Sequence, residues 1–387
     1  MSPVADALRT GRLIVTAGTG GVGKTTTAAA LALLAAASGR RTAVLTIDPA
    51  RRLAQTLGLS SMTSEGQQVG PNLHAFMLDM STTADAMVRR FAPDEAAARR
   101  ILDNPYYRAF STSLAGTQEY MAVEQVSALL QSGAYDLVIL DTPPAVHALD
   151  FLDAPERILI ALDHKAVHWL YRGPLSGSAG YGSRLVGRGR KLVFRSLDKF
   201  TGGPFFEDLA TFLQAFSALF DAFRTSSRVV HELLRGPDTH FLVVTSPSLT
   251  MVREAIAFRA ELLERGFPFR AFICNRVHQP VAAAELSAVH SALVASGLSN
   301  KRAASLSTVL LATQAEHASM AARDAVGIAA LKEAAGQSPS VVPLLAFDVH
   351  DLWALSILGR YLVGNFPGAT GVHDGDEAEE TDSTRRT

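Results

Sequence analysis

The sequence predicts an α/β fold built on a doubly wound, mostly parallel sheet. Short runs of Val, Ile, Leu and Phe without polar alternation recur along the chain, as is typical of parallel strands buried on both faces. Stretches of helical pattern separate these runs and would supply right-handed crossovers between parallel strands. The chain has 387 residues, 48% of them hydrophobic, which is ample for a substantial core.

Eight apolar runs are predicted to be strands of this sheet. They are residues 12–18, 42–48, 73–79, 135–141, 157–162, 239–246, 270–277 and 341–345.

Two connections between these strands are too long for simple crossovers. Residues 81–133 and 164–236 carry helical patterns, and we expect these insertions to form a helical subdomain on a core of residues 12–364. Residues 1–11 would form an N-terminal segment. Residues 365–387 are polar and acidic, with six Asp or Glu against two Arg, so we expect a disordered tail.

Residues 18–25 carry the most specific motif. They read Gly-Thr-Gly-Gly-Val-Gly-Lys-Thr after an apolar run, which is the pattern of a phosphate-binding loop. The glycines allow a tight turn whose N–H groups point at phosphate, and the helical stretch at 26–37 adds the positive end of its dipole. Lys24 would place a cation against the β- and γ-phosphates, and Thr25 would offer a hydroxyl to Mg²⁺. The residues expected to bind the phosphates are Gly20, Gly21, Val22, Gly23, Lys24, Thr25 and Thr26.

The same glycines also satisfy the dinucleotide pattern G-x-G-x-x-G. Asp48, at the end of the next strand, lies roughly where a ribose-binding acid would be expected. A dinucleotide loop, however, has no use for a Lys-Thr pair after its third glycine. The pattern therefore favours a P-loop that binds a nucleoside triphosphate.

Two aspartates end predicted strands on the same side of the sheet. Asp48 begins Asp-Pro-Ala-Arg-Arg, and Asp141 begins Asp-Thr-Pro-Pro-Ala-Val-His. Ligands of doubly wound sheets lie beyond the carboxyl ends of the strands, so both acids would point toward the phosphate loop. We expect Asp141 to supply the negative charge that Mg²⁺ requires. A helix cap is the alternative for either aspartate, and for Asp48 the two roles are compatible.

Composition excludes several classes of protein. A net charge of −1 gives no overall bias toward nucleic acid or anionic membranes. The only cysteine, Cys274, lies in an apolar run, so disulfides within the chain and Cys-x-x-Cys zinc sites are excluded. The first residues lack a basic region followed by an apolar one, and we expect a cytoplasmic protein.

The loop, the Asp48-Pro-Ala segment and the Asp141-Thr-Pro-Pro segment with His147 together resemble a known family. It comprises the arsenite-pump and tail-anchored-protein-targeting ATPases, or anion-transporting ATPases, and the likeness is greatest to an actinobacterial branch. The resemblance covers roughly residues 12–363 and implies ATP and Mg²⁺ as cofactors. It also implies that Asp48 orients the attacking water and that the Asp141 segment senses the γ-phosphate. Asn275 would contact adenine, and Pro343 would lie in the segment that lines the adenine pocket.

This chain departs from the family pattern in three places. Thr19 stands where the family loop normally has a lysine, which acts across a dimer on the partner's nucleotide. The metalloid-binding cysteines of the pumps and the zinc cysteines of the targeting members are both absent. The expected partner is therefore a second copy or a lysine-bearing paralogue. Arg51 could replace the lysine within the chain. Arg52 beside it is either a phosphate contact or a solvated helix start. His147 would have a coupling role.

Three functions remain open on the sequence. The first is an ATP-hydrolysing switch whose helical subdomain holds a hydrophobic protein client, supported by an apolar stripe over 209–223 that core packing also explains. The second is a positioning ATPase that contacts a membrane or DNA through the basic face of 184–199. The third is a regulatory nucleotide-binding subunit with little hydrolysis of its own, consistent with Thr19.

Overall fold

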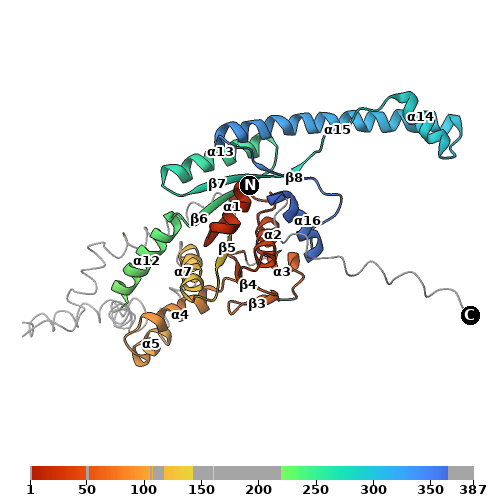
Figure 1. The fold of residues 1–387 in the computed structure, drawn as a ribbon. Helices are drawn as coiled ribbons and strands as arrows, with labels where there is room; N and C mark the ends of the chain where they lie inside the picture. Colours follow the sequence, from red (N-terminus) through yellow and green to blue (C-terminus); the bar gives the residue numbers. More distant parts are fainter. Residues whose placement is uncertain are drawn as a thin grey trace, which may run out of the picture.

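The computed structural model describes residues 2–48, 52–104, 107, 117–142, 160 and 219–364. Its centre is one eight-stranded sheet of order β3-β4-β2-β5-β1-β6-β7-β8, in which all neighbours are parallel except β3 and β4 (Figure 1). The strands are β1 (Leu13–Gly18), β2 (Thr42–Thr46), β3 (Gln67–Gly70), β4 (Leu73–Met77), β5 (Leu137–Asp141), β6 (Thr239–Thr245), β7 (Phe269–Val277) and β8 (Ser340–Pro343). The predicted doubly wound α/β class is confirmed.

Helices cover both faces of this sheet. The described helices are α1 (Pro3–Thr10), α2 (Lys24–Ala37), α3 (Arg52–Thr56), α4 (Met80–Phe91), α5 (Glu95–Leu102), α7 (Thr117–Gln131), α12 (Phe220–Arg235), α13 (Leu249–Glu264), α14 (Leu286–Ala295), α15 (Asn300–Ala335) and α16 (Leu352–Val363). Successive residues of β1 serve opposite cores: Ile14 packs with α1, α2 and α16, whereas Leu13 and Val15 pack with α7, α12 and α13. Two buried faces explain why the strands read as continuous apolar runs.

The sequence missed one strand and misplaced another. β3 contains Gln67 and Gln68, is half exposed and pairs antiparallel at the sheet edge through a turn in which Asn72 has φ 60°. A short, polar edge strand lacks the apolar run by which the other strands were predicted. Of the predicted strand 157–162, only residue 160 is described. It is helical and 63% exposed, so the prediction is wrong there.

The first long connection is helical where it is described. It contains α4, α5 and α7, and α12 lies at the end of the second connection. The apolar stripe and the basic face predicted within 164–236 fall almost wholly outside the described residues. The boundaries of the helical subdomain stay predictions, as does the tail at 365–387.

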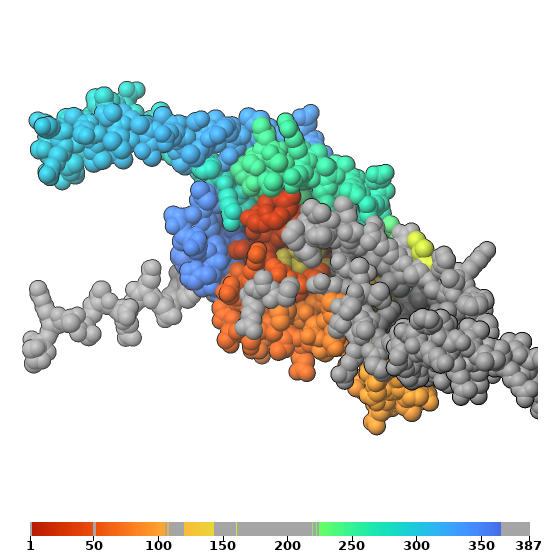
Figure 2. All heavy atoms as spheres, turned by 180° about the vertical axis from the view of Figure 1, so that it is seen from behind, coloured from red at the N-terminus to blue at the C-terminus, as the bar shows by residue number. Residues whose placement is uncertain are grey.

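A third helical insertion, between β7 and β8, was not predicted. Residues 281–320, which we call the arm, comprise α14 and the first half of α15 and project away from the sheet (Figures 1 and 2). α15 has 36 residues, which corresponds to roughly 54 Å of helix. Its second half returns to the core, where Leu331 is fully buried. Among the described helices, none is both long enough and apolar enough to cross a bilayer.

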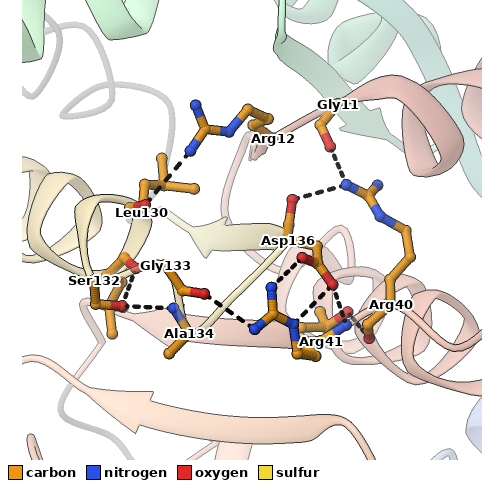
Figure 3. A network of polar contacts seen from close by, with 11 residues as sticks. Gly11, Arg12, Arg40, Arg41, Leu130, Ser132, Gly133, Ala134 and Asp136 are labelled. Atoms are coloured by element: carbon orange, nitrogen blue, oxygen red, sulfur yellow. Dashed lines mark hydrogen bonds and ion pairs between the residues drawn. The ribbon is translucent and has the colours of Figure 1, made fainter.

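Two neighbouring arginines stabilise the end of the sheet at which the parallel strands begin (Figure 3). Arg40 is half-buried and donates to three main-chain carbonyls: those of Leu8, Gly11 (2.8 Å) and Asp136 (2.8 Å). Arg41 instead pairs with the exposed Asp136 carboxylate, at 2.5 Å between Nη2 and Oδ1. Hydrogen bonds from Arg41 lower the pKa of Asp136 to about 2.

This difference gives a stability prediction. Arg40→Met leaves three carbonyls without their donor and should reduce the free energy of unfolding by about 2–4 kcal/mol. The matched variant Arg41→Met removes an exposed ion pair and should cost about 1 kcal/mol or less. Urea denaturation of both variants measures the two losses. Equal losses would show that Arg40 does not stabilise this end of the sheet as described.

Candidate functional site

The loop between β1 and α2 has a backbone that only glycine can follow at two points. Gly18 has φ 148°, and a Cβ there would lie 2.0 Å from the carbonyl oxygen of Val244 on β6. Gly23 has φ 96°, and a Cβ there would lie 2.4 Å from the Asn275 amide nitrogen. The loop is therefore pressed between β6 and the end of β7. The helix α2 begins at Lys24, directly after it.

Lys24 lies over this loop rather than pointing into solvent. Its side chain is 8% exposed, and Nζ donates to the carbonyl oxygen of Thr19 at 2.9 Å. Burial lowers the pKa of Lys24, and the negative charges of Asp141 and Asp48 oppose that shift. A buried ammonium at the mouth of a glycine loop is suited to phosphate oxygens, which would replace a neutral carbonyl with a charged partner.

Asp141, the last residue of β5, lies at the centre of the site. Its Oδ2 accepts hydrogen bonds from the Thr25 hydroxyl (2.8 Å) and the Thr46 hydroxyl (3.0 Å). Its Oδ1 is buried without a hydrogen-bond partner. Burial raises the pKa of Asp141 to about 6, although both hydroxyls act against that rise. Thr46 was not predicted, but β2 pairs with β5 in the register that sets Thr46 beside Asp141.

This arrangement fits a hydrated Mg²⁺ ion held jointly with phosphate. Among the described residues, no group of three His, Cys, Asp or Glu side chains could hold a metal ion unaided. Thr25 donates its proton to Asp141, so its lone pairs remain available to a cation. The unpartnered Oδ1 of Asp141 could accept from a water ligand, and Mg²⁺ usually keeps several waters.

Asp48 lies at the neighbouring strand end. Its main-chain N–H donates to the Thr46 hydroxyl at 3.2 Å, and its carboxylate lies 3.8 Å from Nε of Arg52. The Asp48 carboxylate is about one-third exposed, and Arg52 is at the exposed start of α3. Arg51 and His147 fall outside the described residues. The structure thus brings Lys24, Thr25, Asp48 and Asp141 together, as the strand-end argument predicted, while their roles stay predictions.

The two residues expected on the adenine side lie near the carboxyl ends of adjacent strands, Asn275 on β7 and Pro343 on β8. Asn275 donates from Nδ2 to the carbonyl oxygen of Val22 at 2.9 Å, and its Oδ1 accepts from the N–H of Arg276. Pro343 pairs with Val277 where β8 meets β7. Arg276 has φ 61°, a left-handed backbone that is uncommon for a residue with a side chain. No sequence signal marked this residue.

The Thr19 side chain is directed at a neighbouring helix. Its hydroxyl lies 3.2 Å from the sulfur of Met251, near the start of α13. The residue at the position of the family lysine is therefore directed toward the chain's own α13.

The strand–loop–helix unit and the buried acid at the end of β5 define the P-loop nucleoside triphosphatase class. Residues 11–169 match the family model described as anion-transporting ATPase. Over these residues the chain is similar to that family.

Several relatives carry names of the same kind. A Paramecium tetraurelia protein named ATPase ASNA1 homolog 1 is 32% identical over 150 residues, which are 37% of this chain and 43% of that protein. Proteins named ATPase GET3 from Malassezia globosa and Phaeosphaeria nodorum are 27% and 28% identical over 241 and 261 residues. Those matches cover 58% and 63% of this chain, and 70% and 78% of the relatives. The chain thus spans less than half the length of the Paramecium protein. The actinobacterial branch stays a prediction.

The raised pKa of Asp141 predicts how pH affects the nucleotide-free protein. The carboxyl has a pKa of about 6 in the fold and 3.8 as its ordinary value, so the folded state binds the proton more tightly. Its contribution to stability is therefore full below pH 3.8 and is lost as the pH rises through 6, a change of about 3 kcal/mol. Asp141→Asn should lack this loss. Denaturant unfolding of both proteins from pH 4 to 7 measures it, and parallel curves would contradict it.

Proposed function

We propose that this chain binds Mg²⁺-ATP at the loop of residues 18–25 and hydrolyses it to ADP and phosphate. The proposal rests above all on the connected contacts that join Thr25, Asp141, Thr46 and Asp48 beside the buried Lys24. The family match and the ATPase names of the relatives support the same reaction.

Phosphoryl transfer needs positioned charge more than covalent chemistry from the protein. Bound Mg²⁺ supplies positive charge to the phosphate oxygens, and Thr25, oriented by Asp141, is the residue that would hold it. Lys24 exchanges its bond to Thr19 for the β- and γ-phosphates. Asp48, fixed through its N–H on Thr46, orients the attacking water. Asn275 and Pro343 flank adenine at the ends of β7 and β8.

The nucleotide state would reach the helical subdomain through the end of β2. The carbonyl of Thr46 accepts from the N–H of Leu78 at 3.0 Å, and the next residue, Asp79, caps the start of α4. Thr46 contacts both Asp141 and Asp48. A movement of either aspartate on loss of the γ-phosphate would therefore be passed through Thr46 and Leu78 to the start of α4. We propose that the subdomain containing α4 and α7 uses this movement to hold or release a hydrophobic protein client.

A second candidate function is a regulatory nucleotide-binding subunit with little hydrolysis of its own. The observation that favours it is the Thr19 hydroxyl, which lies against Met251 of the same chain. A threonine directed there supplies no positive charge to a partner's nucleotide. In that case the productive assembly would be a heterodimer with a lysine-bearing paralogue, and a homodimer would turn over slowly.

Two variants separate binding from hydrolysis. Lys24→Ala removes the cation that meets the phosphates and should abolish Mg²⁺-ATP binding in titration calorimetry. Asp48→Asn should retain binding, because Asp48 acts on water, but lower kcat by about 100-fold or more. The exposed Lys332→Ala, at the end of α15, is the matched control and should behave as wild type.

Binding and turnover measurements on the wild-type protein and these variants also discriminate between the candidate functions. Unchanged affinity in Lys24→Ala would overturn the nucleotide site. Tight binding with no measurable turnover in wild type, restored by a lysine-bearing paralogue, would favour the regulatory subunit.

A further inference from the structure

The arm carries a regular stripe on the exposed side of α15. Its six members are separated by alternating steps of four and three residues, so they align along one face of the helix, as in a coiled-coil seam. They are Arg302, Leu306, Val309, Thr313, Glu316 and Met320, all of them exposed.

A neighbouring side of α15, about 100° round the helix from the stripe, is already covered. Ala303 and Ser307 are fully buried, in the half of α15 that packs with α14. Farther along, Gln314 donates to the carbonyl of Ala282, and the ring of His317 packs edge-on against that of His278. The arm is thus a helical hairpin in which one face of α15 is covered by other parts of the chain. Within the described chain, the stripe is left uncovered.

The arm exposes several large apolar side chains. Val309 is 58% exposed, Leu310 44%, Leu306 38% and Met320 36%, and α14 adds Leu286 at 53% and Val294 at 36%. These six side chains expose on the order of 500 Å² on the arm, of which Leu306, Val309 and Met320 on the stripe contribute about half.

The two charged residues of the stripe indicate which partner would bind to it. Arg302 and Glu316 lie seven residues before and after Val309, on the same face and about 10 Å from it along the helix. When two identical helices cross antiparallel at Val309, Arg302 of each meets Glu316 of the other, on both sides of the crossing. A parallel pairing would set like charges together.

From this symmetry we propose that the arm is a self-association surface. It pairs with the arm of a second copy in a two-fold, antiparallel arrangement, with Val309 on the axis and Arg302–Glu316 ion pairs on either side. The interface lies on the arm and not at the phosphate loop, so it does not rest on the proposed ATPase activity. It also requires no lysine at position 19 and no zinc cysteines.

Crosslinking at the axis tests the geometry. Val309→Cys should form a disulfide-linked dimer under mild oxidation, because each residue 309 meets its own copy. The native Cys274 is fully buried and should not interfere. Ala315→Cys, exposed but on a different side of α15, is the matched control and should crosslink far less. Equal crosslinking of the two variants, or none of Val309→Cys, would overturn the proposal.

Charge reversal tests the pairing itself. Arg302→Glu and Glu316→Arg should each raise the dimer dissociation constant at least tenfold in sedimentation equilibrium, because each sets like charges together at both ends. The double variant should recover most of the affinity. Lys24→Ala should dimerise as wild type whether or not the site binds ATP. A monomeric wild-type protein, as when the stripe serves a different protein, would overturn the proposal, and so would a dimer indifferent to both single reversals.

Discussion

The site depends on one buried carboxylate. Asp141 ends a central strand, and removing its charge from water is costly enough to raise its pKa to about 6. Two hydroxyls and the charge of Lys24 offset part of that cost. The hydroxyls come from different elements: Thr25 from the start of α2 and Thr46 from the end of β2. The same carboxylate therefore fixes the helix that follows the phosphate loop and the strand that carries Asp48. One oxygen is left without a partner, so the site favours a cation and its water.

Much of this arrangement could be predicted from the residues because it follows from local rules. The loop requires glycines, and parallel strands bring Asp48 and Asp141 to the same end of the sheet. Seven of the described strands are apolar runs, and the central ones are buried on both faces. What could not be predicted depends on distant contacts. Thr46 joins the site through strand register, and Asn275 reaches the loop at Val22 through the fold. β3 is polar and lies at the edge, where no core pattern marks it.

The arm escaped prediction for a different reason. Its apolar residues are not buried in the chain's own core, and α14 has no buried residue at all. Its root nevertheless lies close to the phosphate loop. Three residues after Asn275, the His278 main chain and ring both contact Asp324 of α15 at 2.8 Å. One short segment therefore links the loop contact at Val22 to the helix that carries the arm, across the left-handed residue Arg276.

The central claim is that Thr25, oriented by Asp141, completes a metal site only together with a triphosphate. Electron paramagnetic resonance with Mn²⁺ in place of Mg²⁺ tests it directly. In the presence of a non-hydrolysable ATP analogue, one Mn²⁺ should bind per chain. Without the analogue binding should be weak, and Thr25→Val should weaken it even when the analogue is present. Tight Mn²⁺ binding without the analogue, or binding unchanged in Thr25→Val, would contradict the account.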